Sequence, residues 1–285
     1  MTLDLLARGS GDPDGIARWR PDLVALQGAA GDRAADLLGP EYRIVRPSRR
    51  SVGGIGAVFG GRWPVGAVIG SRWPVGAVHE IDLRVTPRAD PWCAAVLAEI
   101  EAPGGPLLFV HHRPAREWGQ ARERELQAVA CARFVEGRLA GRNLRVVLAG
   151  DLGDTPDAAS VRFWTGRQPL HGTRVAYRDA WAARPRVQYR DALAAGPRIQ
   201  DRDACDAGPG VWDRDARAAG PRAQDRDAGD VGPVRCARVW DRDNGDPGAA
   251  RREYVLVRRG GPGVRVLDCA PAFGDSGVVA DLGLA

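Results

Sequence analysis

The sequence predicts an α/β domain, and two observations support that prediction. Short apolar runs alternate with helical segments along most of the 285 residues, a pattern typical of chains that layer helices on β-sheets. Polar residues follow directly after several of these runs, where α/β proteins place their chemistry. The chain is 44% hydrophobic and 27% charged, so it contains enough apolar material for a packed core.

Two strands are expected in the first half of the chain. After Arg20-Pro21-Asp22, the run Leu23–Gln27 reads as a buried strand. Pro106–Val110 reads as another, which ends at His111 and His112. The two histidines therefore stand at the end of a predicted strand.

A long helix should follow, over Glu117–Leu139, and end near Gly141. The helical period places arginine and glutamate residues on one side of it. The apolar side consists of Leu126, Val129, Ala130 and Phe134.

The next predicted strand, Leu144–Ala149, runs into Gly150-Asp151. A helix then opens at Thr155-Pro156-Asp157, with Thr as its cap and Gly166 beyond its end. Three closing strands are expected at Tyr254–Val257, Val264–Leu267 and Val278–Leu282.

A repeat interrupts this pattern over residues 177–248. A twelve-residue unit rich in Asp, Arg, Ala, Gly and Pro recurs there, and the tract contains 13 Arg and 13 Asp. Each unit has few large apolar residues and a Gly-Pro breaker, so it supports neither a helical nor a strand period. We expect a largely disordered insertion within a single domain spanning residues 1–285.

The charge and the cysteines restrict the class of protein. The net charge of +5 includes no lysine, and this basic balance permits a phosphate-bearing partner such as nucleic acid. No apolar run approaches the roughly 18 residues of a membrane span, and no secretory signal is recognised. The five cysteines are scattered without a CxxC pair, so a cytoplasmic location is expected.

Several stretches, taken together and in order, resemble the endonuclease/exonuclease/phosphatase superfamily, which has the DNase-I-like fold. Their span covers nearly the whole chain except the repeat tract. The stretches are Arg20–Gln27, Ser71–Val75, Val110–Pro114, Val147–Asp151, Thr155–Asp157, Arg251–Val257 and Gly277–Leu282.

The resemblance implies a four-layer sandwich of two packed mixed β-sheets flanked by helices. It also implies hydrolysis of phosphate esters with Mg²⁺ or Mn²⁺ as cofactor. Such a metal polarises the phosphate and stabilises the leaving oxygen, while a carboxylate orients the attacking water and a His shares the developing charge.

Carried over residue by residue, the resemblance assigns catalytic roles to Asp151, His112 and Asp275. Asp151 keeps the Asp of the family's Gly-Asp-Phe-Asn/Asp motif, and His112 matches the His after its strand. Asp275 is what remains of a terminal Ser-Asp-His motif, whose His is absent.

The resemblance assigns the remaining site roles to Asp4 and Glu253 as metal ligands and to Arg252 in substrate binding. Arg252-Glu253-Tyr254 stands for the family's Arg-Arg-Ile-Asp-Tyr, with Glu in place of Asp. The metal-binding Glu that follows Leu-Gln in the family is Gly28 here.

These departures predict severely reduced activity, because removing one positioned polar group typically costs about 10²–10³ in rate. Three hypotheses remain open. The chain is a weakened metal-dependent phosphoesterase, or an inactive relative that binds a phosphate ligand or a protein partner, or a decaying reading frame. The sequence does not define the substrate or the oligomeric state.

Overall fold

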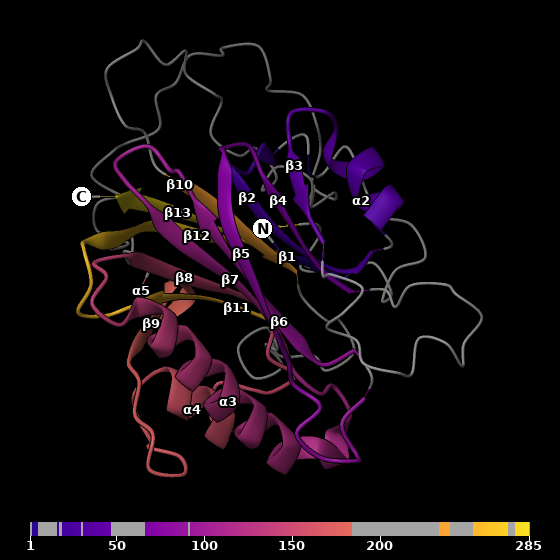
Figure 1. The fold of residues 1–285 in the computed structure, drawn as a ribbon, viewed down its shortest axis with the longest axis vertical. Coiled ribbons are helices and arrows are strands. Elements are labelled where there is room, and N and C mark those ends of the chain that lie inside the picture. The colour runs from indigo at the N-terminus through magenta and orange to yellow at the C-terminus, as the bar shows by residue number, and fades with distance from the viewer. Residues whose placement is uncertain are drawn as a thin grey trace, which may run out of the picture. The chain divides into compact units, whose positions relative to one another are not determined.

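Two mixed β-sheets lie face to face at the centre of the structure, a computed structural model, with helices outside them (Figure 1). The structure describes residues 2–4, 16, 19–29, 31–46, 66–90, 92–183, 234–239, 253–272 and 277–284. All of these belong to one unit, Met1–Arg184 with Val231–Ala285. Residues 185–230 lie outside the described residues.

The first sheet has the strand order β12-β13-β10-β2-β4-β3, and β1, which is not part of this order, also pairs with β2. β1 and β10 run parallel to β2, and the remaining pairs are antiparallel. The strands are β1 (Thr2–Asp4), β2 (Leu23–Ala29), β3 (Arg43–Val45), β4 (Gly66–Ser71), β10 (Val234–Val239), β12 (Val264–Ala272) and β13 (Gly277–Leu284).

The second sheet has the order β5-β6-β7-β8-β11-β9. β7 and β8 are parallel, and every other pair in this order is antiparallel. The strands are β5 (Val75–Asp82), β6 (Ala94–Ile100), β7 (Leu107–Arg113), β8 (Arg145–Asp151), β9 (Tyr177–Asp179) and β11 (Glu253–Arg258).

Helices cover the outer faces of both sheets. α2 (Gly31–Leu38) packs on the first sheet. α3 (Ala121–Leu139), preceded by the short 3₁₀ helix η2 (Trp118–Gln120), and α4 (Ala159–Trp164) pack on the second. The expected four layers are therefore confirmed (Figure 1).

The middle of the sandwich is an apolar core supplied by alternate residues of both sheets. Successive side chains of a strand point to opposite faces, so Leu23 and Ala25 of β2 meet Phe109 of β7 and Val147 of β8 between the sheets. The intervening residues of β7 and β8 pack under α3 and α4 instead. Each central strand of the second sheet is thus buried on both faces, and this explains its continuous apolar run.

Two helix predictions need correction. The buried face of α3 consists of Glu123, Arg124, Gln127 and apolar residues that include Val135, whereas Ala130 and Phe134 are only partly buried. The second helix begins at Ala159, because residues 155–157 form a turn, so Thr155 is not its cap.

The fold also uses part of the stretch expected to be an insertion. Tyr177 opens β9 and is fully buried, and Ala180–Ala183 form the helical turn α5. Near the far end of the tract, β10 pairs with β2 and β13. The expectation of disorder for the rest of residues 177–248 falls outside the described residues.

Within the described part of the chain, no helix combines the length and apolar character needed to cross a membrane.

Candidate active site

The two faces of β7 and β8 give the site its geometry. Phe109, Val147 and Ala149 point between the sheets, whereas Val110 and Leu148 point toward the helices. His111 pairs with Ala149 in the parallel register of these strands. By the alternation of a strand, His111 and Asp151 follow the inter-sheet face.

His111 is completely buried on that face, beside the backbone of Val68 on β4. Neither of its ring nitrogens has a hydrogen-bond partner of good geometry among the described residues. Burial, followed by the positive charge of Arg113, lowers the pKa of His111 to about 3. The ring is therefore neutral at pH 7, with one nitrogen as a donor and the other as an acceptor.

His112, the predicted catalytic histidine, turns to the opposite face of β7. Its ring meets Trp164 of α4 edge-on, with the ring centres 5.6 Å apart. Burial alone lowers its pKa to about 3. The structure does not bring His112 together with Asp151, because the two residues lie on opposite faces of the sheet; His111 occupies the face of Asp151 instead.

Asp151 is the last residue of β8 and is almost fully buried. Its Oδ1 accepts a hydrogen bond from the backbone N–H of Gly153 at 2.7 Å, and its Oδ2 lies 3.0 Å from Nε of Arg116. A turn and a guanidinium thus fix the carboxylate at the end of the strand.

Gly150 allows β8 to approach β7 closely at this point. A Cβ on Gly150 would overlap the carbonyl oxygen of His112. Any side chain here would push the two strands apart and displace Asp151.

Backbone register brings three further predicted positions to the same region. Glu253 opens β11 directly opposite Asp151. Asp4 ends β1 opposite Gln27 of β2, and β1 and β2 both contact β8. Gly28, which replaces the expected Glu, is the next residue of β2 after Gln27.

Gln27 adds an amide that the sequence analysis did not single out. Its side chain is completely buried, and among the described residues neither its Oε1 nor its Nε2 has a partner. It follows Leu23 and Ala25 on the inter-sheet face. Buried amides without partners are costly, so this group is suited to a ligand.

The loop after Asp151 is tied to the helices rather than to the site. Asp154 accepts a hydrogen bond from Ser160 at 2.7 Å and pairs with Nε of Arg124 at the same distance. Its backbone carbonyl accepts a hydrogen bond from the hydroxyl of Tyr254. These contacts hold the end of β8 against α3 and α4.

The remaining two predicted residues, Arg252 and Asp275, lie outside the described residues. The described side chains by themselves do not compose a metal centre. No group of three or more His, Cys, Asp or Glu residues among them has a suitable arrangement, and both oxygens of Asp151 are already engaged.

Sequence reasoning missed His111, Gln27 and Arg116. Side chains two residues apart on a strand share a face, so Ala149 and Asp151 lie on the same face of β8. His111 pairs with Ala149, so the strand register, had it been known, would have placed His111 rather than His112 on the face of Asp151. No local pattern marks Arg116, which meets Asp151 only through tertiary packing.

The sequence model of the Endonuclease/Exonuclease/phosphatase family matches residues 6–269 of this chain, and no curated protein matches the chain.

Three solved structures illustrate the fold, and each is compared by sequence identity, coverage of both chains and TM-score. An endonuclease/exonuclease/phosphatase from Bacteroides vulgatus is 14% identical, covers 100% of this chain and 97% of its own, and has a TM-score of 0.56. A mannosyl-6-phosphatase of Bacteroides thetaiotaomicron is 13% identical, with 99% coverage of both chains and a TM-score of 0.56. D. rerio TDP2 in complex with a single-strand DNA product is 13% identical, with 99% and 97% coverage and a TM-score of 0.54. At these identities the likeness concerns the fold.

Proposed function

Because this chain belongs to the endonuclease/exonuclease/phosphatase family, we propose that it is a metal-dependent phosphoesterase whose rate is severely reduced. The observation that supports the proposal most directly is the placement of buried polar groups on the two faces that meet between the sheets. His111 and Asp151 follow the inter-sheet face of the second sheet, and Gln27 follows that of the first. A hydrolase needs such groups around the phosphorus atom.

The proposed roles follow from the protonation states. Neutral His111 donates one N–H to a phosphate oxygen without bringing a charge of its own, and Gln27 offers a second N–H. Asp151 orients the attacking water. Arg116 supplies positive charge beside the carboxylate, and its guanidinium is able to hold a phosphate oxygen.

Members of this family use a divalent metal, and we propose Mg²⁺ or Mn²⁺ for this chain, with Asp4 and Glu253 as ligands. The backbone registers support these ligands, since Glu253 lies opposite Asp151 and Asp4 lies opposite Gln27.

The proposed loss of rate comes from Gly28. A carboxylate at this position would stand next to Gln27 at the end of β2, and its absence removes one negative charge that a hard cation requires. Removal of such a group costs about 10²–10³ in rate.

A second candidate function is phosphate binding without turnover. The engagement of both carboxylate oxygens of Asp151 favours it, because the Gly153 N–H and the Arg116 guanidinium each take one acceptor site on an oxygen and so compete with a water for the carboxylate. In this second candidate function the chain binds a phosphate-bearing ligand and does not hydrolyse it. Structures that share the fold include a mannosyl-6-phosphatase and a protein bound to a DNA product, so the fold accommodates phosphate ligands of different kinds.

Hydrolysis of a generic phosphodiester, bis(p-nitrophenyl) phosphate, with Mg²⁺ or Mn²⁺ tests the proposal. The wild type should turn over slowly, EDTA should abolish turnover, and Asp151→Ala should lower the rate by about 10²–10³. Gly28→Glu should raise it. His111→Gln should impair hydrolysis, whereas the matched His112→Gln should leave it within about threefold.

If neither the wild type nor any variant hydrolyses the phosphodiester, while the protein unfolds cooperatively and still binds phosphate, the second candidate function is supported. If His111→Gln and His112→Gln lower the rate of hydrolysis equally, the assignment of the catalytic groups to the inter-sheet face is wrong.

A further inference from the structure

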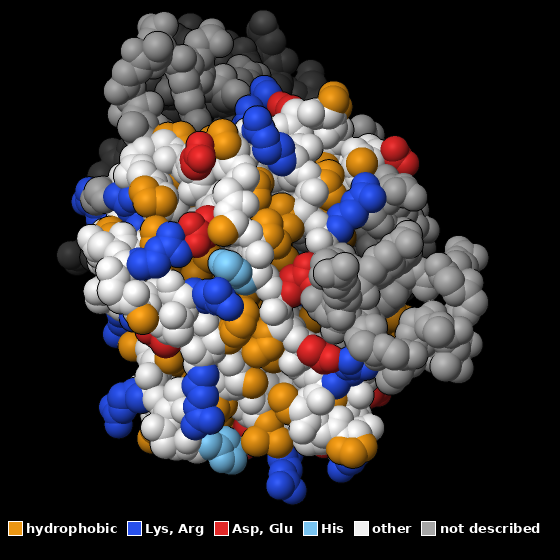
Figure 2. Space-filling view, in the orientation of Figure 1, with side chains coloured by type: hydrophobic (Ala, Val, Ile, Leu, Met, Phe, Trp, Pro, Cys, Tyr) orange, Lys and Arg blue, Asp and Glu red, His pale blue; other side chains and the backbone are white. Residues whose placement is uncertain are grey.

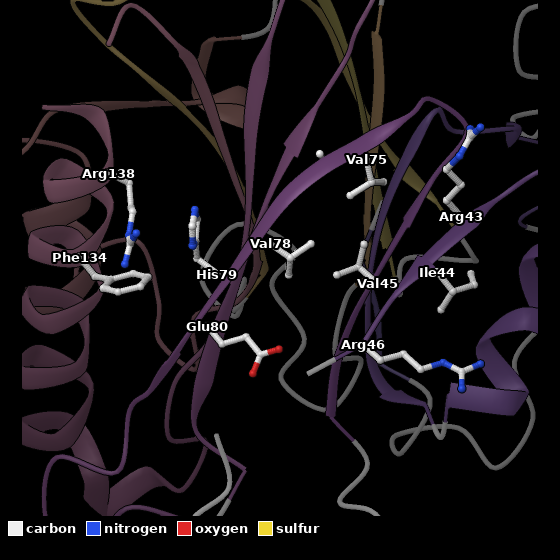
Figure 3. Close-up of a pocket in the computed structure, with 11 residues that line it drawn as sticks. Arg43, Ile44, Val45, Arg46, Val75, Val78, His79, Glu80, Phe134 and Arg138 are labelled. Atoms are coloured by element: carbon white, nitrogen blue, oxygen red, sulfur yellow. The ribbon is translucent and has the colours of Figure 1, made fainter. Parts of the chain in front are cut away.

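Arginine side chains are scattered over the surface of the protein, where Figure 2 shows them in blue. Three of them, Arg43, Arg46 and Arg138, line a pocket of about 760 Å³ beside β3 and β5 (Figure 3). Arg138 lies over the ring of Phe134, whereas Arg43 and Arg46 point away from it on the other side of the pocket. The pocket therefore does not present the three to one ligand. Arg124 differs from them, because it is only 3% exposed.

Arg124 stands in the first turn of α3 and contacts two loops. Its Nε lies 2.7 Å from Oδ2 of Asp154, in the loop after β8. Its Nη1 donates a hydrogen bond of 2.7 Å to the carbonyl oxygen of Glu117 and reaches that of Ala115 at 3.5 Å, in the loop after β7. A guanidinium carries its N–H donors in a rigid planar fork, so this one side chain fixes both loops at once.

Each of these loops carries one half of the ion pair at the candidate active site. Asp151 lies three residues before Asp154, and Arg116 stands between Ala115 and Glu117. Nε of Arg116 lies 3.0 Å from Oδ2 of Asp151. The backbone is thus tied to α3 on both sides of Arg116, and the same guanidinium holds the loop of its partner.

The two loops are also in direct contact. Gly153 has a φ of +68°, and a Cβ there would lie 2.6 Å from the carbonyl oxygen of Ala115 and 3.1 Å from Cδ of Arg124. The N–H of Gly153 donates the hydrogen bond to Oδ1 of Asp151. Only glycine combines this backbone conformation with such close approach. A shift of one loop would therefore move the other, and with it the carboxylate.

The charge of Arg124 is not needed to fill the space under α3. Both Arg124 and Asp154 are largely buried, with side chains 3% and 13% exposed. The cost of removing two charges from water offsets much of their attraction, so a buried ion pair contributes little net stability compared with apolar residues. What the pair does supply is a fixed orientation, because its hydrogen bonds have defined directions.

We propose that Arg124 is a positioning residue: by holding the loops after β7 and β8 together, it sets Arg116 against Asp151 in the geometry that a phosphate ester meets. Its effect on hydrolysis rests on the proposed function. Its effect on the ion pair does not, because the pair forms without a ligand.

NMR of the arginine Nε–H groups, with nitrogen-15 labelling, tests the positioning without any turnover. The signal of Arg116 is assigned by its absence from Arg116→Ala. In Arg124→Gln this Nε–H should exchange with water at least about tenfold faster than in the wild type, because exchange follows the free energy of local opening. The amide N–H of Gly153 should also exchange faster, since its acceptor Asp151 is no longer held.

Arg145→Gln is the matched control. Arg145 is a second buried arginine, at the other end of β8, and its Nη1 donates a hydrogen bond of 2.7 Å to the carbonyl of Gly104. Both variants lose a buried guanidinium that binds a loop carbonyl, so urea unfolding should show a loss of stability in each. Only Arg124→Gln should change the exchange at Arg116.

Hydrolysis of bis(p-nitrophenyl) phosphate by the same variants tests the consequence for the reaction. Arg124→Gln should lower kcat/KM by about 10- to 100-fold, the scale of a small misplacement of reacting groups. In an Arg116→Ala background the same substitution should change kcat/KM by less than about twofold, because the pair that it positions is already absent. Arg124→Lys keeps the charge without the planar fork. It should give intermediate values, both in exchange and in kcat/KM, and it serves if Arg124→Gln folds poorly.

Unchanged exchange at Arg116 in the Arg124 variants would overturn the proposal, as would equally fast exchange in Arg145→Gln. Full additivity of the losses from Arg116→Ala and Arg124→Gln in kcat/KM would also contradict it. If the wild type does not hydrolyse the phosphodiester, the proposed function fails, but the exchange measurement still decides the role of Arg124.

Discussion

Buried polar side chains on the two faces of the second sheet differ in how well they are hydrogen-bonded. Under the helices, Gln127 is completely buried and both ends of its amide are hydrogen-bonded, since it accepts a hydrogen bond from the N–H of Ala115 and donates one to the carbonyl of Leu83, both at 2.8 Å. Between the sheets, Gln27 and His111 are equally buried. Gln27 has no hydrogen-bond partner among the described residues, and His111 meets only the backbone of Val68, without good hydrogen-bond geometry. The first arrangement stabilises the fold, whereas the second leaves polar groups for a ligand.

This difference indicates which buried residues are candidates for function when the family's catalytic motifs are altered. A buried polar group that the fold does not satisfy costs about 1–3 kcal/mol, so its presence needs a reason other than stability. The helix face has exceptions of its own, among them Oε2 of Glu123, Nδ1 of His112 and the hydroxyl of Tyr177, and the last two provide controls.

The largest effect is expected for Gln127→Leu compared with Gln27→Leu. Gln127→Leu leaves a buried N–H and a buried carbonyl without partners, so the free energy of unfolding should fall by about 4 kcal/mol, or about 2 per group. Gln27→Leu should change stability by less than about 1 kcal/mol. Urea unfolding of both variants measures the difference, and equal losses would contradict the contrast between the two faces.

Gly150→Ala should destabilise the protein by about 3 kcal/mol. The added methyl group overlaps the His112 carbonyl oxygen, so β7 and β8 must separate. Gly137→Ala is the control, because a Cβ there meets nothing within 4 Å. On α3 it should be neutral or should stabilise the helix by up to about 1 kcal/mol. Thermal melts of both variants would show whether close strand approach is required.

Stability should fall as the pH is lowered from about 6.5 toward 3. His111 and His112 have folded pKa values of about 3, whereas an unfolded imidazole titrates near 6.5, so the unfolded state takes up protons first in this window. Each histidine contributes a slope of up to about 1.4 kcal/mol per pH unit.

Each of His111→Gln and His112→Gln should remove one such contribution from the pH dependence of unfolding. Inorganic phosphate sharpens the contrast between the faces. It should raise the pKa of His111 alone, as followed by imidazole NMR signals. A phosphate-dependent shift at His112 would contradict the assignment of His111 to the site.

The smallest expected effect is the difference in stability between two Tyr→Phe variants. Tyr254→Phe removes a hydrogen bond of 3.0 Å to the carbonyl of Asp154 and should cost about 1 kcal/mol. Tyr177→Phe removes a buried hydroxyl that has no partner in the described part of the chain, so it should be neutral or slightly stabilising. Chemical denaturation resolves the pair.

Sequence patterns predicted most of the central strands because apolar runs and breakers are local signals. Leu23–Gln27 lies within β2, and Leu144–Ala149 largely coincides with β8, of which Asp151 is the last residue. The pairing of Asp22 with Arg72 at 3.1 Å links two of the quoted stretches. That contact is long-range, and no local pattern reports it.

The candidate site was less predictable from the sequence. The choice between His111 and His112 depends on strand register, which is set by tertiary pairing. The helical period also failed on α3, where Arg124 and Gln127 are buried because Asp154 and two backbone groups satisfy them. A prediction based on the polarity of the residues along the helix therefore places such residues wrongly on the surface.

Among the described strands, β3 and β5 each stand at one end of a sheet order. An edge strand invites pairing with a second chain. β3 is only three residues long, and β5 carries His79, Glu80 and Asp82, the last bonded to Arg84 at 2.9 Å. A short strand and charged side chains are features by which edge strands resist such pairing. We therefore expect removal of the charges at Glu80 and Asp82 to lower the solubility of the protein.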